Sequence, residues 1–196
     1  MARPSNGCST ADPLGVRVVA GTAKGTRLAA VPAGTRPVSD RAREGLFSSL
    51  GTVVEGARVL DLFAGTGAMG IEALSRGAAS ALFVDSAPAA AKVIAENLRR
   101  TRLQGRGVVR RQDARRALRQ KPAQFDLVIL DPPYLAPQAL VDGVLAEIAG
   151  QGIVAPGGRV VLTRSSRSYT PVIPLHWQLE RRLSYGEAAV LVLQAP

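Results

Sequence analysis

The stretch ARVLDLFAGTGAMGIEALSRG, residues 57–77, decides how this chain is expected to fold. Its first seven residues are mostly apolar, as in a buried strand, and the segment 68–77 reads as a helix that ends at Gly77. Between them, Gly65 and Gly67 lack the Cβ atoms that would keep a ligand away from the backbone. The start of the following helix exposes N–H groups that have no partner within the helix. A strand, a glycine-rich turn and a helix in this order predict a ligand-binding loop.

The alternation of strand and helix continues toward the C-terminus. Strands are expected at 80–85, 107–113, 125–131 and 158–164, and helices at 88–103, 114–120 and 137–150. Strands that alternate with helices form parallel sheets covered on both faces. The stretches 176–185 and 187–194 follow each other with no helix between them, which predicts an antiparallel pair. The predicted fold is therefore α/β and Rossmann-like, with a seven-stranded, mostly parallel sheet and an antiparallel C-terminal strand.

The residues before this core predict a small extension. Residues 1–14 are small, polar and proline-containing, and read as a disordered tail. The segments 17–20 and 26–30 flank a glycine-bearing loop, which indicates a β-hairpin. A helix capped by Ser39 or Asp40 is expected to follow. The predicted division is a tail at 1–14, a hairpin-and-helix appendage at 15–51 and a Rossmann-like domain at 52–196.

Composition narrows the classes of function. Of 196 residues, 46% are apolar, which is enough for the core of one compact domain. The chain carries 25 Lys and Arg against 15 Asp and Glu, and its formal charge of +10 favours a polyanionic partner, unless the chain is merely rich in arginine. With one cysteine, Cys8, and one histidine, His176, an internal disulfide is excluded and a zinc site or a Ser-His-Asp triad is not expected.

The sequence also bears on the compartment. No apolar run approaches the roughly 18 residues that span a bilayer. Residues 1–15 lack the apolar centre of a signal peptide. A cytoplasmic protein that does not enter a membrane is expected.

The glycine loop alone leaves two cofactors open. Gly65, Gly67 and Gly70 satisfy the G-x-G-x-x-G dinucleotide pattern, and Asp85 ends the next strand, where a ribose-binding acid belongs. Asp61, just before the glycines, distinguishes the two. Its carboxylate suits the ammonium of S-adenosylmethionine but would repel the pyrophosphate of a nicotinamide cofactor. The loop therefore favours S-adenosylmethionine.

Further acids follow successive strands. Asp85 can bind both ribose hydroxyls, and Asp113, or the backbone N–H of Ala114, can read the adenine edge. Each acid alone could be a helix N-cap, but acids at three successive strand ends favour a cofactor site. The expected cofactor-binding residues are Asp61, Phe63, Ala64, Gly65, Thr66, Gly67, Asp85, Ser86, Asp113 and Ala114.

The tetrapeptide Asp131-Pro132-Pro133-Tyr134 directly follows FDLVIL, residues 125–130, at the same sheet edge and predicts the catalytic residues. An exocyclic base amine is a poor nucleophile because its lone pair is delocalised into the ring. Asp131 and the Pro132 carbonyl can accept hydrogen bonds from the two amine hydrogens, and the prolines hold these acceptors still. Tyr134 can stack on the base, which is worth about 1–3 kcal/mol. A simple strand-ending turn is the alternative reading.

These motifs carry a resemblance to a known family. The string at 61–67 resembles motif I of the Rossmann-like methyltransferases, and Asp-Pro-Pro-Tyr resembles the [D/N/S]-P-P-[Y/F/W] motif of amino-methyltransferases. The other matching strings are RVVAGTAKGTRL (17–28), TRPVSDRAREGLFSSL (35–50) and SYGEAAVLVL (184–193). Together they are similar to the bacterial 16S ribosomal RNA guanine-N2 methyltransferases, the RsmD family, from about Arg17 to Val192. The resemblance implies a class I methyltransferase fold and S-adenosylmethionine as cofactor.

The resemblance also implies a substrate, which is a guanine in 16S rRNA within an assembling 30S subunit. The protein is expected to be a monomer. The appendage at 15–51 would bind the RNA, through Arg17, Lys24, Arg27, Arg36, Arg41 and Arg43. Ordinary solvated charges are the alternative for these residues, and Arg41 could instead face the cofactor's carboxylate. Other functions left open are adenine-N6 or cytosine-N4 methylation of DNA or RNA, a nicotinamide-dependent oxidoreductase, and an RNA-binding assembly factor without chemistry.

Overall fold

The computed structural model describes residues 15–31, 38–120 and 123–196. Within them, seven strands form one sheet in the order β3-β2-β1-β4-β5-β7-β6. The strands are β1 (Arg58–Leu62), β2 (Ser80–Asp85), β3 (Gly107–Arg111), β4 (Phe125–Leu130), β5 (Val154–Ser165), β6 (Gln178–Tyr185) and β7 (Ala188–Gln194). Strands β1 to β5 are parallel, and β7 runs antiparallel to both β5 and β6. The predicted mostly parallel sheet with an antiparallel C-terminal strand is confirmed.

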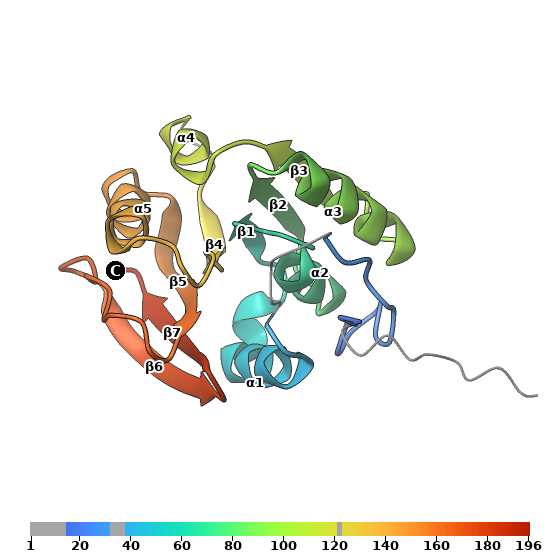
Figure 1. The fold of residues 1–196 in the computed structure, drawn as a ribbon, viewed down its shortest axis with the longest axis horizontal. Helices are drawn as coiled ribbons and strands as arrows, with labels where there is room; N and C mark the ends of the chain where they lie inside the picture. The colour runs from blue at the N-terminus through green and yellow to red at the C-terminus, as the bar shows by residue number, and fades with distance from the viewer. Residues whose placement is uncertain (1–14, 32–37, 121–122) are drawn as a thin grey trace, which may run out of the picture.

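Helices cover both faces of the sheet (Figure 1). They are α1 (Asp40–Leu50), the 3-10 helix η1 (Gly51–Val54), α2 (Ala68–Ser75), α3 (Pro88–Arg100), α4 (Ala114–Arg119) and α5 (Gln138–Gly150). Because strand side chains alternate between faces, Val59 packs with residues of α1, α2 and α3, whereas Leu60 packs with residues of α4 and α5. Asp61 therefore points to the face that α1 and α2 cover.

Local chemistry explains where two helices begin and end. Ser39 caps α1, because its hydroxyl oxygen accepts a hydrogen bond from the N–H of Ala42 at 3.2 Å. Helix α3 ends at Arg100, three residues earlier than predicted, and Arg102 adopts a left-handed φ of 58°. That conformation cannot continue a right-handed helix, so the chain turns into the loop before β3.

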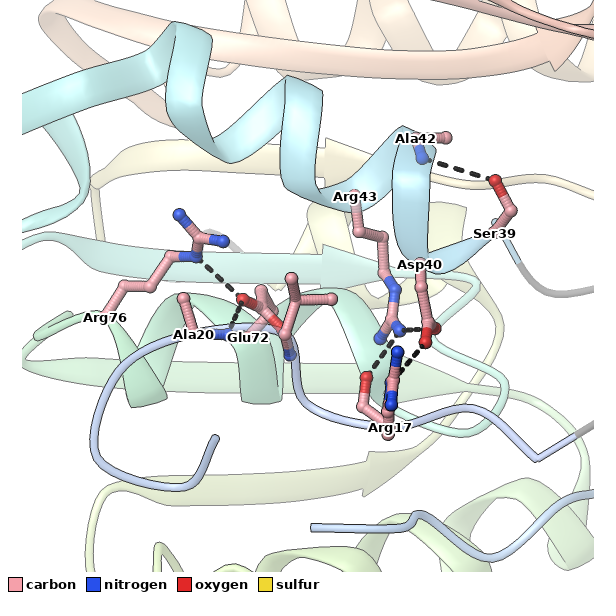
Figure 2. Close-up of polar contacts among 9 residues, drawn as sticks. Arg17, Ala20, Ser39, Asp40, Ala42, Arg43, Glu72 and Arg76 are labelled. Carbon is pink, nitrogen blue, oxygen red and sulfur yellow. Dashed lines mark hydrogen bonds and ion pairs between the residues drawn. The ribbon is translucent and has the colours of Figure 1, made fainter. Parts of the chain in front are cut away.

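The two arms of the segment 15–31 pair antiparallel, as in the predicted hairpin, through the N–H groups of Val18, Gly25 and Leu28, but they form no regular strands. The segment has a single antiparallel bridge, Arg17 to Arg27, in place of two strands. Helix α2 also holds this backbone: the N–H groups of Val19 and Ala20 donate to the buried carboxylate of Glu72, at 2.7 and 3.0 Å. Figure 2 shows this contact and the Arg76 guanidinium that donates to the same carboxylate. Val18 also lies in the hydrophobic cluster of the sheet, so the segment packs against the main body.

Several predictions fall outside the described residues. They are the disordered tail at 1–14 with Cys8, and the RNA contact of Arg36. The predicted boundary between the appendage at 15–51 and the Rossmann-like domain at 52–196 stays a prediction. In the part of the chain that the structure covers, no helix is long and apolar enough to cross a membrane.

Candidate functional site

A cavity of about 550 Å³ opens at the carboxyl ends of β1, β2 and β4. These strands are neighbours in the sheet, so the loops that follow them meet at one edge. The cavity brings together most of the residues that the sequence predicted for cofactor binding and catalysis. These are Asp61, Phe63, Ala64, Gly65, Thr66, Asp85, Ser86, Asp131, Pro132, Pro133 and Tyr134. The glycine loop and the Asp-Pro-Pro-Tyr motif therefore face one common space.

Three predicted cofactor residues do not line this cavity. Gly67 precedes α2 with a left-handed φ of 76°, which glycine adopts without strain. Asp113 caps α4 by accepting the N–H of Arg116 at 3.0 Å, and Ala114, the first residue of α4, is buried in the hydrophobic cluster that α4 and α5 form with the sheet. Asp113 lines a smaller neighbouring hollow, which it shares with Ser86. The adenine-reading role of Asp113 and Ala114 stays a prediction.

The carboxylate of Asp85 joins the two loops that frame the cavity. Its Oδ2 accepts the N–H of Gly65 at 2.9 Å, and its Oδ1 accepts the N–H of Ala87 at 2.8 Å. Phe63 lies between β1 and this loop with a φ of 60°, which is uncommon outside glycine and is often found at binding sites. Each oxygen of Asp85 keeps a second lone pair that a ligand hydroxyl can use.

Asp61 is a buried carboxylate with half of its hydrogen-bonding capacity open. Its Oδ2 accepts the N–H of Gly70 at 2.9 Å, while Oδ1 has no partner among the described residues. Burial, together with the nearby charges of Asp131 and Asp85, raises the pKa of Asp61 well above its ordinary value. An unpartnered buried carboxylate oxygen is costly, and a cationic ligand group would relieve that cost.

The third glycine of the loop has a packing role. A Cβ atom on Gly70 would lie 2.4 Å from the ring of Phe83 and 3.0 Å from Oδ2 of Asp61. Glycine at this position lets α2 approach the sheet closely enough for its N–H to reach Asp61. The G-x-G-x-x-G pattern thus serves strand–helix contact here and does not require a dinucleotide.

Asp131 lies half-buried directly after β4 and also lines the cavity. Its Oδ1 accepts a short hydrogen bond from the hydroxyl of Thr163, which is buried on β5. Burial raises the pKa of Asp131 to about 6, and the bond from Thr163 opposes that rise. The sequence analysis missed Thr163; its signal was a hydroxyl within the otherwise apolar run VVLTR.

The mouth of the cavity exposes apolar surface. Tyr134 is 39% exposed, and the next residue, Leu135, is 95% exposed, although both line the cavity. An aromatic ring and an aliphatic side chain at the edge of a pocket offer a stacking surface to a planar ligand.

The predicted RNA-contacting residues fall into two groups. Arg17, Lys24, Arg27 and Arg41 are exposed, as phosphate contacts would be. Arg43 is fully buried and lines the cavity, which corrects its predicted place on the surface. Arg41 is not among the cavity residues, so the alternative that it faces the cofactor finds no support. Residues 43, 46, 47 and 50 share one face of α1, which places Arg43 on its buried side.

The charges of the cavity suit a cationic ligand. Its lining includes the carboxylates of Asp61, Asp85 and Asp131 and the guanidinium of Arg43. A pyrophosphate would meet three acidic groups, which disfavours a dinucleotide. S-adenosylmethionine, with an ammonium and a sulfonium, fits these carboxylates. Asp61 can accept a hydrogen bond from the ammonium, and Asp85 can accept hydrogen bonds from the ribose hydroxyls.

Comparison with known proteins agrees with the geometry. The family model described as "Conserved hypothetical protein 95" matches residues 16–194. Ribosomal RNA small subunit methyltransferase D of Escherichia coli (strain K12) is 32% identical over 180 residues, which are 91% of this chain and 89% of that protein.

Solved structures share the fold over nearly the whole chain. The Escherichia coli protein yhhF superposes with a TM-score of 0.83 and 31% identity, covering 92% of this chain and 98% of that one. A hypothetical protein of Thermus thermophilus gives a TM-score of 0.74 and 34% identity, covering 90% and 98%. The predicted class I methyltransferase fold is confirmed, and the chain belongs to the RsmD family, the ribosomal RNA small subunit methyltransferases D.

Proposed function

We propose that this protein transfers a methyl group from S-adenosylmethionine to the exocyclic N2 amine of a guanine in 16S rRNA. The observation that carries the proposal is the shared cavity: the loop at Gly65 and the carboxylate of Asp131 line the same 550 Å³ space. A cofactor in one part of this space and a base in the other would bring their reacting atoms together. The name of the Escherichia coli relative, which specifies the small ribosomal subunit, supports the choice of RNA.

The chain's own groups would hold the cofactor by its polar ends. The open Oδ1 of Asp61 accepts from the ammonium, and Asp85 accepts from the ribose hydroxyls. The bound cofactor supplies an electrophilic methyl group on a positively charged sulfur. Asp85 also fixes the backbone of the glycine loop, so the loop and the ribose contact are set by one carboxylate.

Asp131 would orient the base amine. With Oδ1 held by Thr163, Oδ2 stays available to accept one amine N–H, and the Pro132 carbonyl can accept the other. These two bonds favour a pyramidal nitrogen whose lone pair points away from Asp131. The proton that the nitrogen loses passes to Oδ2 of Asp131, and from there to solvent. Ionised Asp131 is required, and its pKa of about 6 leaves it mostly ionised at neutral pH.

The substrate end of the site is built for an extruded base. A guanine inside stacked RNA has to leave its stack to enter a cavity, and Tyr134 at the mouth offers a ring on which it can stack. The exposed Arg17, Lys24, Arg27 and Arg41 contact the phosphate backbone, helped by the net charge of +10. The protein acts as a cytoplasmic monomer on an assembling 30S subunit.

A DNA or RNA amine methyltransferase with another base is the second candidate, because the Asp-Pro-Pro-Tyr motif does not itself select a base. Purified protein with methyl-labelled S-adenosylmethionine should be offered deproteinised DNA, naked 16S rRNA and partially assembled 30S particles. The proposal expects label in the rRNA of the particles. Equal or greater incorporation into DNA would favour the second candidate.

The cofactor has its own test. Calorimetry should detect S-adenosylmethionine binding and no binding of NAD. The reverse result would return the glycine loop to its dinucleotide reading and end the proposal.

A further inference from the structure

Arg43 on α1 is a buried cation with unused hydrogen-bond donors at the wall of the cavity. Its side chain is fully buried. Nη2 donates to the backbone carbonyl of Arg17 at 2.6 Å and to Oδ1 of Asp40 (Figure 2). Nε and Nη1 are also buried, and neither has a hydrogen-bond partner among the described residues.

Such an arrangement is costly for the protein alone. A guanidinium taken out of water needs its donors satisfied, and an unpaired buried donor loses its hydration without compensation. Asp40 supplies one countercharge, but it reaches only Nη2 and is shared with Nε of Arg17 at 3.0 Å. The N–H groups on Nε and Nη1 lie on different sides of the guanidinium, and each can donate one charge-assisted hydrogen bond to an oxyanion.

The position of Arg43 beside Asp61 indicates which oxyanion its unpartnered N–H groups would bind. Arg43 and Asp61 line the same cavity, and Asp61 points to the sheet face that α1 and α2 cover. Asp61 has an unpartnered acceptor, Oδ1, and Arg43 has two unpartnered donors, Nε and Nη1. An α-amino acid group, with its ammonium and its carboxylate on neighbouring atoms, satisfies both.

We propose that Arg43 binds the carboxylate at the amino-acid end of the cofactor, opposite the Asp61 contact to its ammonium. The inference rests on the proposed function and assigns to this arginine a subsite that the sequence analysis gave only as an alternative for Arg41. An RNA phosphate offers the same chemistry, but a fully buried guanidinium is poorly placed for a polymer backbone. Exposed Arg17 and Arg41 are accessible to it instead.

The test compares two ligands that differ in the amino-acid end. S-adenosylhomocysteine carries it, and 5′-methylthioadenosine lacks it. By calorimetry, Arg43→Gln should bind S-adenosylhomocysteine about tenfold or more weaker than the unchanged protein, and methylthioadenosine less than about twofold weaker. Arg43→Lys should recover part of the loss, because it restores the charge without the planar donors. Unchanged affinity for S-adenosylhomocysteine, or an equal loss for both ligands, would overturn the inference.

A control variant and a ligand change make the test independent of folding. Arg99→Gln removes an exposed, ion-paired arginine of α3 and should leave both affinities as they were. The unchanged protein should bind the methyl ester of S-adenosylhomocysteine about tenfold weaker than the free acid, because the ester removes the charge that Arg43 contacts. Equal affinity for ester and acid would contradict the carboxylate contact.

The same binding measurements distinguish a cofactor carboxylate from an RNA phosphate as the ligand of Arg43. They also distinguish a failure of this inference from a failure of the proposed function. If Arg43→Gln weakens binding of a 16S rRNA fragment in a filter assay and leaves S-adenosylhomocysteine binding intact, the ligand of Arg43 is a phosphate and the inference is wrong. If the unchanged protein binds NAD and not S-adenosylhomocysteine, the proposed function fails as well.

Discussion

Replacing Thr163 by valine removes one hydroxyl from the proposed active site and keeps nearly the same side-chain shape. In the structure this hydroxyl donates to Oδ1 of Asp131, and it lies 3.4 Å from the carbonyl oxygen of Leu130. Thr163 is 2% exposed, so water does not readily take its place. The variant therefore isolates the hydrogen bond that holds the carboxylate.

The sign and size of the effect follow from the charge on Asp131. A bond to the ionised carboxylate lowers its pKa, so removing the bond raises the pKa above the present value of about 6. Hydrogen bonds to charged groups are worth about 1.5–3 kcal/mol, and about 1.4 kcal/mol corresponds to one pKa unit, so a shift to about 7 or higher is expected. The ionised fraction would fall about fivefold at pH 6 and about twofold at pH 7.

The assay is single-turnover methyl transfer to 30S particles between pH 5.5 and pH 9. For the unchanged protein, the rate should rise with pH through a midpoint near 6, since Asp131 must be ionised to accept the amine hydrogen. For Thr163→Val the midpoint should move up by about one unit, and Thr163→Ser should restore it. S-adenosylhomocysteine affinity should be the same in all three proteins. An unmoved midpoint in the valine variant would show that the Thr163 hydrogen bond does not set the ionisation of Asp131 during methyl transfer.

Three further outcomes test the site. Asp131→Ala should lower methyl transfer by about 10²-fold or more while cofactor affinity, measured by calorimetry, stays unchanged; full activity would remove Asp131 from its role. Asp85→Ala should weaken S-adenosylmethionine binding by about tenfold or more, because Asp85 also holds the backbone of Gly65, and an unaltered Kd would speak against the ribose contact. Gly70→Ala should lower the free energy of unfolding by about 1–3 kcal/mol in urea titrations, since its Cβ would lie 2.4 Å from Phe83; a loss below about 0.5 kcal/mol would contradict that packing.

The motifs of this chain could be interpreted from sequence because each one reflects a local backbone requirement. Gly65 adopts a left-handed φ of 55° and the two prolines restrict the backbone after Asp131, so residue type alone pointed to both loops. Alternation of apolar strands with helices then fixed the layers of the sheet. Since β1 and β4 are adjacent parallel strands, the two loops had to meet at one edge.

What the sequence did not reveal depends on contacts between distant segments. The docking of segment 15–31 on α2 is one such contact: Glu72 and Ser75 accept N–H groups of Val19, Ala20 and Ala23, across about 50 residues that no local pattern connects. The bond between Thr163 and Asp131 likewise needs the register of β4 and β5. The burial of Arg43 was also missed, although a local pattern showed it. Its spacing from Leu46 and Phe47 places it on the buried side of α1, which the prediction of a surface RNA contact overlooked.

If the proposed function holds, the cavity brings the sulfonium methyl of the cofactor to the N2 amine of a guanine. Mass spectrometry of nucleosides measures this directly, in 30S particles treated with the protein and methyl-labelled S-adenosylmethionine and then digested. We expect the label in N2-methylguanosine and expect particles treated with the Asp131→Ala protein to lack it. Label in N6-methyladenosine or N4-methylcytidine, or equal labelling by the Asp131→Ala protein, would contradict the proposed function.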